Sequence, residues 1–194
     1  MADAYENLDE YLWLADQVDF HEADQAMALG RLLYEKLSPK SVIDIGCSSG
    51  IYLVPFIVRF VTDVLGIDGA HGVGKWIPGK FEVVDLRQPW TPPKEFDLAL
   101  SIEVGEHLRP GFHPTLVETI SKCAPVVFWT AAPLGQGGEG HYGERPRQEW
   151  IDLFAGFGYH IHPLNDEIIG IIQQQPESAH CGWLRTNSVV FQRG

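Results

Sequence analysis

The residues best suited to bind a ligand lie in a loop of small residues that follows an apolar run. Residues 41–50 read SVIDIGCSSG, which predicts a short strand that ends near an acid and enters a tight turn before a helix. A helix start offers unpaired backbone N–H groups and a partial positive charge. Gly46 and Gly50 let the backbone approach a ligand closely, because neither carries a Cβ atom. This segment therefore predicts a ligand site.

A second acid, Asp68, ends the next apolar run. An acid about 20 residues beyond such a loop can accept hydrogen bonds from both ribose hydroxyls of a nucleoside, so we expect an adenosine-containing cofactor. A nicotinamide-binding loop has the glycine spacing G-x-G-x-x-G. Counted from Gly46, the second and third glycine positions hold Ser48 and Ile51, and this disfavours a dinucleotide.

The loop fits a different pattern, acid-x-G-x-(G/S)-x-G, with Asp44 as the acid. With this pattern the chain resembles the class I S-adenosylmethionine-dependent methyltransferases, and the resemblance extends over roughly residues 40–192. It implies that Asp44 helps to hold the amino-acid end of the cofactor and that the glycine loop passes beneath its adenosine. An acidic site suits S-adenosylmethionine, because this cofactor carries positive sulfonium and ammonium groups.

Two further apolar runs complete the resemblance. Residues 81–86 end in Asp85 and Leu86; the resemblance implies that this acid accepts a hydrogen bond from the adenine amino group and that the leucine lies against the ring. Alternatively, Asp85 is a helix cap or turn residue. Residues 96–104 resemble the family's fourth strand, whose carboxyl end faces the methyl group. The resemblance implies a cofactor site formed by Asp44, Gly46, Cys47, Ser48, Gly50, Asp68, Gly69, Asp85, Leu86, Ser101 and Glu103.

Strand-like runs alternate with helix-like segments along most of the chain. The runs lie at about 41–45, 63–67, 81–85, 96–101, 125–130, 159–162 and 186–192. This alternation predicts an α/β fold with a parallel sheet and helices on both faces. The resemblance implies a doubly wound, Rossmann-like sheet of seven strands, of which the last is antiparallel. We expect one methyltransferase domain over residues 1–194, with an N-terminal helical cap at 1–38 and the cofactor-binding core at 39–194.

Local signals mark several helices. Pro55 falls inside the first crossover helix, so we expect a kink or a late helix start there. Residues 146–156 begin with proline and end with glycine, as helices commonly do. Residues 5–36 have helical spacing of apolar residues, and their aromatic side chains either pack in the core or cover the cofactor as a lid. These aromatic and imidazole side chains are Tyr5, Tyr11, Trp13, Phe20 and His21.

Composition narrows the choice of partners. A net charge of −12 disfavours free nucleic acid and favours a small-molecule acceptor. The apolar run 51–61 is short and contains Pro55 and Arg59, so we expect no membrane span. The chain starts without a secretory signal, and its three cysteines are far apart, which fits buried thiols in a reducing cytoplasm. The oligomeric state stays open.

A cluster of acids and imidazoles has the form E-x-x-E-H, from Glu103 through Glu106 to His107. On a helical turn the three side chains would share a face and could bind a divalent cation that polarises a hydroxyl. Some relatives, including small-RNA 2′-O-methyltransferases, use a similar motif with a metal. Many metal-free relatives carry a near-identical segment, in which the acid caps a helix and the histidine packs under the cofactor. We expect no metal here.

The loop at residues 130–146 contains five glycines within nine residues and continues into His141. We expect His141 to be the general base, because an imidazole titrates near neutrality, and we expect His107 to be a second catalytic residue. Alternatively, His141 only forms a hydrogen bond to the next helix. Arg145 either holds an anionic group of the substrate or pairs with Glu144 or Glu149. A glycine-rich loop suits closure over substrate better than a rigid coordination sphere, which again disfavours a metal.

Together these observations predict an S-adenosylmethionine-dependent methyltransferase that acts on a small polar acceptor, with a hydroxyl favoured. Two alternatives stay open. One is a non-catalytic partner subunit that binds S-adenosylmethionine, since alignment of an already activated methyl group requires few catalytic side chains. The other, less favoured, is a nicotinamide-dependent oxidoreductase, which would share the fold.

Overall fold

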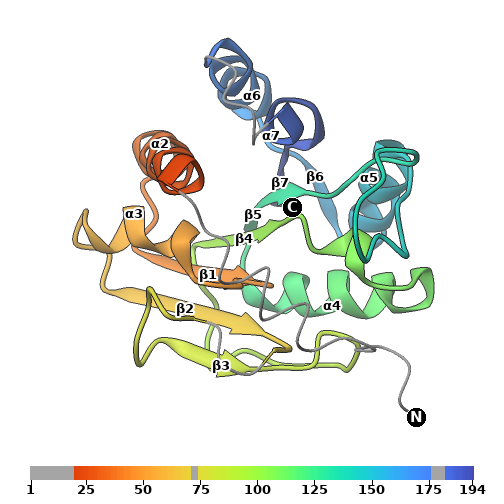
Figure 1. Cartoon of the computed structure of the whole chain (residues 1–194), viewed down its shortest axis with the longest axis horizontal. Coiled ribbons are helices and arrows are strands. Elements are labelled where there is room, and N and C mark those ends of the chain that lie inside the picture. Colours follow the sequence, from red (N-terminus) through yellow and green to blue (C-terminus); the bar gives the residue numbers. More distant parts are fainter. Residues whose placement is uncertain (1–19, 71–73, 176–181) are drawn as a thin grey trace.

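The computed structural model describes residues 20–70, 74–175 and 182–194 of the chain. In this part of the chain a seven-stranded sheet with the order β3-β2-β1-β4-β5-β7-β6 lies between two layers of helices (Figure 1). The strands are β1 (Ser41–Ile45), β2 (Asp63–Asp68), β3 (Phe81–Val83), β4 (Leu98–Ile102), β5 (Val126–Thr130), β6 (Tyr159–Ile161) and β7 (Val189–Arg193).

The strand directions confirm the predicted fold class. Strands β1 to β5 are paired in parallel, whereas β7 is antiparallel to both β5 and β6. In the register of the central strands, Asp44 of β1 lies opposite Gly66 of β2 and Leu100 of β4. The end of β1 is therefore flanked on both sides by the ends of neighbouring parallel strands.

Two strands begin later than the sequence predicted. Strand β4 starts at Leu98 rather than at residue 96, because the carboxylate of Asp97 accepts hydrogen bonds from the backbone N–H groups of Lys40 and Ser41. Strand β7 starts at Val189 rather than at residue 186, because the preceding residues belong to a short helix. Strand β3 ends at Val83, two residues early, where the edge of the sheet gives way to a turn.

The helices form two layers. They are α2 (Phe20–Leu37), α3 (Val54–Ile57), α4 (His113–Cys123), α5 (Arg147–Gly156), α6 (Asn165–Gln174) and α7 (Gly182–Asn187), with 3-10 helices η1 (Ile51–Leu53), η2 (Gly105–His107) and η3 (Pro110–Phe112). Helices α2, α3, α6 and α7 cover one face of the sheet, and α4 and α5 cover the other (Figure 1).

Alternating side chains of each central strand supply the two cores. In β1, Val42 belongs to the core under α2, whereas Ile43 and Ile45 belong to the core over α4. Both faces of the strand are buried, which explains why β1 is almost continuously apolar in sequence. Helix α4 contributes Leu116, Val117 and Ile120, whose helical spacing places them on one buried face.

The first crossover confirms the late helix start predicted at Pro55. The chain first forms the 3-10 turn η1, and α3 begins at Val54, so Pro55 lies in the first turn. A proline there costs little, because its missing N–H would have no partner within the helix. The predicted helix at 146–156 is also present, as α5 over Arg147–Gly156.

The described part of the predicted N-terminal cap is α2, which packs as an integral layer of the fold. Its residues Leu29 and Leu33 belong to the same core cluster as Phe56 of α3. Of the residues proposed as a lid, Tyr5, Tyr11 and Trp13 lie outside the described residues, and Phe20 and His21 form the first turn of α2. Among the helices of the described residues, none has the length and apolar character needed to cross a membrane.

Two helical glycines give a matched test of this packing. A Cβ atom on Gly30 of α2 would lie 2.2 Å from Cγ of Pro55, whereas one on Gly170 of α6 would meet nothing within 4 Å. We expect Gly30→Ala to lower the free energy of unfolding by about 1–2 kcal/mol through overpacking. Gly170→Ala should raise it by up to about 1 kcal/mol through helix propensity. Urea denaturation measures both, and a stabilised Gly30→Ala variant would contradict the packing of α2 on α3.

Candidate active site

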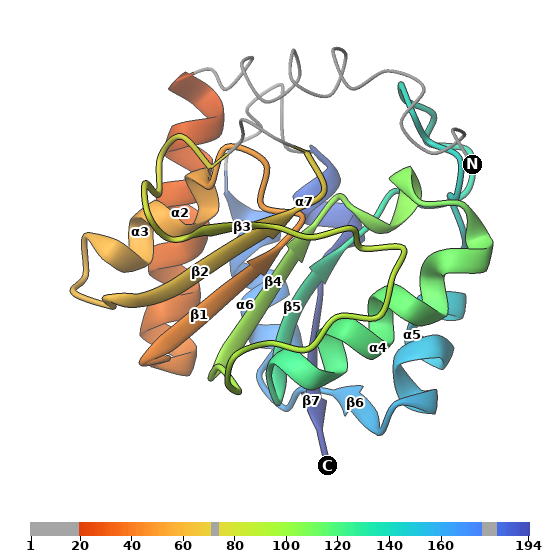
Figure 2. The ribbon, with the colours of Figure 1, turned by 90° about the horizontal axis from the view of Figure 1, so that it is seen from below.

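The candidate site lies where several parallel strands end at one edge of the sheet. Figure 2 shows β1, β2, β4 and β5 running side by side in the same direction. Asp44 lies one residue before the end of β1, and Asp68 is the last residue of β2. Ser101 lies near the end of β4, so the predicted cofactor residues of three strands come together. Ligands of open α/β sheets bind at this edge.

The glycine loop after β1 is a sharp turn attached to the end of β2. The backbone N–H groups of Gly46 and Cys47 both donate to the carbonyl oxygen of Ile67, at 2.8 and 3.0 Å. Gly46 has a φ of +79°, and a Cβ atom there would lie 2.4 Å from Cγ2 of Val104. Glycine is therefore required at this position for both conformation and space.

Asp68 connects the glycine loop to β2. Its two carboxylate oxygens accept hydrogen bonds from the backbone N–H groups of Ser48 and Ala70, each at 2.9 Å. Burial raises the pKa of Asp68, while these backbone hydrogen bonds, and that of Gly69, act in the opposite direction. Each oxygen has a second lone pair, so the same carboxylate can also accept hydrogen bonds from ribose hydroxyls.

Asp44 is a buried acid without a cationic partner among the described residues. Its side-chain atom Oδ2 has no hydrogen-bond partner, and the residue is 2% exposed. Burial raises the pKa of Asp44 to about 8, and the nearby charge of Asp68 contributes to the shift. A positively charged group beside Asp44 would relieve this cost, as expected for the amino-acid end of the cofactor.

The predicted adenine contacts have other partners in the structure. Asp85 forms a bidentate pair with Arg87, with Nε to Oδ1 at 2.7 Å and Nη2 to Oδ2 at 2.8 Å. The side-chain hydrogen bond from Arg87 lowers the pKa of Asp85. The backbone N–H of Arg87 also donates to Oδ1, which fits the turn role weighed for Asp85; the contact with adenine stays a prediction. Leu86 is buried in the core cluster that contains Phe96.

Three other predicted cofactor residues are buried or hydrogen-bonded at the ends of strands. Cys47 is buried, which raises the pKa of its thiol well above the usual range. Ser101 is fully buried, and its Oγ atom has no hydrogen-bond partner. The backbone N–H of Glu103 donates to Oγ1 of Thr130 at 2.9 Å, and its Oε1 accepts a hydrogen bond from Nδ2 of Asn187 at 3.3 Å.

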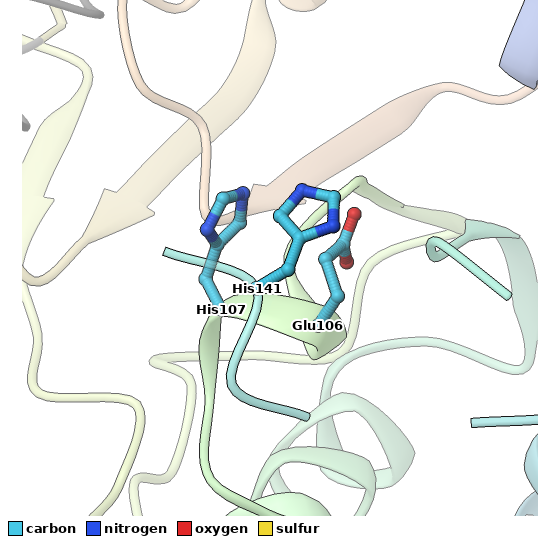
Figure 3. A group of neighbouring side chains, drawn as sticks. All are labelled: Glu106, His107 and His141. Atoms are coloured by element: carbon cyan, nitrogen blue, oxygen red, sulfur yellow. The ribbon is translucent and has the colours of Figure 1, made fainter. Parts of the chain in front are cut away.

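The cluster of acids and imidazoles differs from the sequence prediction. The structure brings together Glu106, His107 and His141, with one nitrogen or oxygen atom of each within 4.8 Å of the others (Figure 3). Glu103 is outside this group, so the prediction that it shares a helical face with Glu106 and His107 is wrong. The reason is local: Glu103 has a left-handed φ of +52°, and the helical turn η2 begins only at Gly105.

Two members of this cluster, Glu106 and His107, are uncharged near neutral pH. Glu106 is fully buried, and neither carboxylate oxygen has a hydrogen-bond partner of normal geometry. Burial, and secondarily the charge of Glu103, raises the pKa of Glu106 to about 9. Burial, and secondarily His141, lowers the pKa of His107 to about 4. Glu106 is therefore protonated and His107 neutral at pH 7, and their neighbour His141 lies edge-on to the His107 ring at 5.0 Å between centroids.

The glycine-rich loop is tightly turned and lies against η2. The ring atom Nδ1 of His107 donates to the carbonyl oxygen of Gly140 at 3.2 Å, and the N–H of Gly143 donates to the carbonyl oxygen of Glu106 at 2.8 Å. A Cβ atom on Gly143 would lie 1.9 Å from the carbonyl oxygen of Leu108. The glycines thus permit the close contact that places His141 beside Glu106 and His107.

Sequence reasoning missed the contact between His141 and Glu144. Oε1 of Glu144 lies 2.9 Å from Nδ1 of His141. The signal available in the sequence was only the H-x-x-E spacing, which is common in unrelated contexts. Arg145 does not pair with Glu144; its Nε lies 3.9 Å from Oε2 of Glu149, and its guanidinium lies 4.8 Å over the ring of Trp150. Arg145 is thus occupied by contacts within the protein.

Residues 20–162 match a family model described as a methyltransferase domain. This match covers most of the chain, including the glycine loop, both strand-end acids and the histidine cluster. None of the curated proteins compared with the chain matches its sequence.

Solved methyltransferase structures have a similar fold. The chain is similar to an S-adenosylmethionine-bound amino pentose methyltransferase of calicheamicin biosynthesis from Micromonospora echinaspora, with a TM-score of 0.66, 16% identity and 100% of both chains covered. It is similar to magnesium protoporphyrin IX methyltransferase from Synechocystis PCC 6803 with bound S-adenosylhomocysteine, with a TM-score of 0.64, 14% identity, and 100% of this chain and 98% of that chain covered. The chain is also similar to a candidate O-methyltransferase from Nostoc punctiforme, with a TM-score of 0.62 and 14% identity. That comparison covers 93% of this chain and 58% of the Nostoc chain.

The raised pKa of Asp44 predicts a specific pH dependence of stability. Because its pKa rises from 3.8 to about 8 on folding, the folded protein keeps a proton that the unfolded chain releases. The stability from this group is present below pH 4 and is lost as the pH rises through 8. We expect Asp44→Asn to raise the melting temperature at pH 8 by at least about 3 °C and to give no gain at pH 4.

Differential scanning fluorimetry of the protein without added cofactor measures this effect. Asp24→Asn is the matched control, because Asp24 is exposed on α2, and it should leave the melting temperature unchanged. A lower melting temperature for Asp44→Asn at pH 8 would show that Asp44 has a stabilising partner that the fold does not display.

Proposed function

The chain belongs to the methyltransferase domain family, and from this premise we propose that it transfers a methyl group from S-adenosylmethionine to a small polar acceptor, with a hydroxyl as the favoured nucleophile. Family and fold together confirm the expected class I S-adenosylmethionine-dependent methyltransferase. The observation that carries the finer proposal is a cluster of two histidines and a carboxyl group at the same edge of the sheet as a glycine loop flanked by two buried acids.

The two acids suit the two ends of the cofactor. Asp44, buried and without a cationic partner, would balance the positive ammonium group of the amino-acid end. Asp68, held in place by Ser48 and Ala70, would accept hydrogen bonds from the ribose hydroxyls. S-adenosylmethionine supplies a methyl carbon that its sulfonium already activates, so the protein has mainly to align the acceptor and exclude water.

The acceptor is proposed to lie against the cluster of Glu106, His107 and His141. His141 would accept the proton of the attacking hydroxyl, because its Nδ1 atom is used in the contact with Glu144 and Nε2 is the other basic nitrogen. His107, neutral and donating through Nδ1 to Gly140, would be the second catalytic residue and would border the acceptor beside His141. These assignments keep His141 and His107 as the catalytic residues expected from the sequence.

A small acceptor fits the surface charge of the chain. A net charge of −12 opposes binding of a polyanion such as free nucleic acid. Two of the structurally similar enzymes are described as methyltransferases of an amino pentose and of magnesium protoporphyrin IX, both of which are small molecules. A reducing cytoplasm would suit Cys47 and Cys123, two thiols that are buried and unpaired.

One observation favours a second way to activate the acceptor. Two imidazoles and one carboxylate with ligand atoms within 4.8 Å of one another form a donor set that divalent zinc, iron or manganese accepts. A cation there would polarise the acceptor hydroxyl, and no general base would be needed. The base is preferred, because the buried position of Glu106 favours its protonated form and a metal ligand must be ionised.

The cofactor proposal predicts a selective loss of affinity in Asp68→Asn. A hydrogen bond to a charged group contributes about 1.5–3 kcal/mol, so the dissociation constant for S-adenosylhomocysteine should rise at least about tenfold. Asp97→Asn is the matched control: Asp97 also accepts two backbone N–H groups, but at the start of β1, and its loss should not change the affinity.

Isothermal titration calorimetry with S-adenosylmethionine and S-adenosylhomocysteine measures these affinities. Unchanged binding by Asp68→Asn, or binding of NADH in preference to both ligands by the wild-type protein, would contradict the proposal. Binding without turnover over a broad acceptor panel would instead identify a non-catalytic partner subunit.

The base proposal predicts a loss of turnover without loss of cofactor affinity in His141→Ala. With an acceptor identified from a panel of small alcohols and amines, kcat should fall by about 10²–10⁴-fold. His160→Ala is the control, because His160 is exposed on β6, far along the sheet order from β1, and should retain full activity.

A chelator should leave wild-type activity intact. Loss of activity with the chelator, and its recovery with zinc or manganese, would replace the base by a metal.

A further inference from the structure

We propose that Glu144 is a positioning residue that orients His141 and fixes which of its ring nitrogens carries the proton. The proposal rests on the proposed function, because it states how the histidine assigned as general base is prepared for proton removal. The hydrogen bonds of Glu144 go to His141 and to the backbone of Gly135 and Gly137, so its effect on the reaction would pass through His141.

One carboxylate holds three donors of the same loop. Oε2 of Glu144 accepts a hydrogen bond from the backbone N–H of Gly135 at 2.8 Å, and Oε1 accepts one from that of Gly137 at 2.6 Å. Oε1 also lies 2.9 Å from Nδ1 of His141. The side chains of His141 and Glu144 are 13% and 12% exposed, so both are partly buried by the loop. The ionised side chain of Glu144 thus binds the loop at three points.

The chemistry of this contact determines the tautomer of His141. A carboxylate can only accept, so Nδ1 of His141 must carry the hydrogen in the 2.9 Å contact. The pKa of Glu144 is lowered, with the hydrogen bond from His141 as the largest cause, and the carboxylate is therefore ionised at neutral pH. In the neutral ring this leaves Nε2 without a hydrogen and able to accept the acceptor's proton.

The groups around His141 leave Glu144 as its one anionic contact near neutral pH among the described residues. His107 and Glu106, both from η2, are the other members of its cluster, and burial keeps both uncharged near pH 7. When His141 accepts a proton, the resulting imidazolium faces the ionised Glu144. A buried carboxylate behind a basic histidine acts in the same way in hydrolase triads, where it orients the ring and stabilises its charged form.

The sequence offers a matched control in the same loop. Glu139 is exposed and lies five residues before Glu144, and among the described residues the carboxylate that pairs with His141 is that of Glu144. Glu144→Gln and Glu139→Gln remove the same charge from the same loop. Only Glu144→Gln changes an oxygen atom that accepts a backbone hydrogen bond. The NH₂ group that takes its place can donate a hydrogen bond but cannot accept one.

Nitrogen-15 NMR of histidine-labelled protein tests the proposal without any acceptor. The His141 signals are assigned by their absence from His141→Gln, and the tautomer is read at pH 8 from the shifts of the two ring nitrogens. We expect the wild type and Glu139→Gln to show the hydrogen on Nδ1, and Glu144→Gln to show a substantial population with the hydrogen on Nε2. A wild-type ring with its hydrogen on Nε2, or an unchanged tautomer in Glu144→Gln, overturns the proposal.

Kinetics with the acceptor found for the wild type then separates positioning from a structural contribution. We expect Glu144→Gln to lower kcat by at least about tenfold, with the affinity for S-adenosylhomocysteine unchanged. Equal losses in Glu144→Gln and Glu139→Gln would contradict the proposal. Absence of methyl transfer by the wild-type protein would contradict the proposed function instead, while the NMR result would still decide how Glu144 and His141 interact.

Discussion

The constraint on which the site depends is the parallel pairing of β1 with β2 on one side and β4 on the other. Parallel pairing brings the carboxyl ends of all three strands to one edge of the sheet. The chain leaves β1 towards α3 on one face and leaves β4 towards α4 on the other (Figure 1). In open α/β sheets ligands bind where the crossovers diverge in this way, and the glycine loop, Asp68 and η2 all lie at or after the strand ends on this edge.

The buried charges at this edge of the sheet indicate a ligand site rather than a part of the fold that adds stability. Asp44 and Glu106 are buried acids whose pKa values are raised to about 8 and 9, so their charged forms are disfavoured in the folded protein. Buried polar groups without partners cost stability, and such costs are typical of functional sites. At Asp44 a cationic ligand would relieve the cost. At Glu106 a proton does so, which keeps the histidine cluster close to neutral.

The fold could be predicted from the sequence because its signals are local. Apolar runs marked the strands, and Pro55 marked the late start of α3. The glycine loop could also be predicted, because Gly46 beside Val104 and Gly50 beside Ile77 leave no space for a side chain. One missed contact joins distant residues: Asn187 reaches Glu103 across 84 positions, and no local pattern indicates such a pair. The other joins His141 to Glu144 over three positions, and their H-x-x-E spacing is too unspecific to predict a contact.

The histidine cluster shows where sequence reasoning failed for a physical reason. The E-x-x-E-H spacing implies a shared face only if every residue is helical, and Glu103 has a left-handed backbone instead. The five glycines suggested mobility, yet Glu144 binds the backbone of the loop at Gly135 and Gly137. Glycine content alone cannot distinguish a mobile loop from a tightly turned one, because both require the same backbone freedom.

The central claim is that one crevice holds the cofactor with its reactive end towards the histidine cluster. A crystal structure with S-adenosylhomocysteine tests it most directly. The account predicts ribose hydroxyls on Asp68, the amino-acid end near Asp44, and the sulfur on the side facing His141 and His107. A sulfur that points away from these histidines, or adenosine bound elsewhere than the glycine loop, would contradict the account.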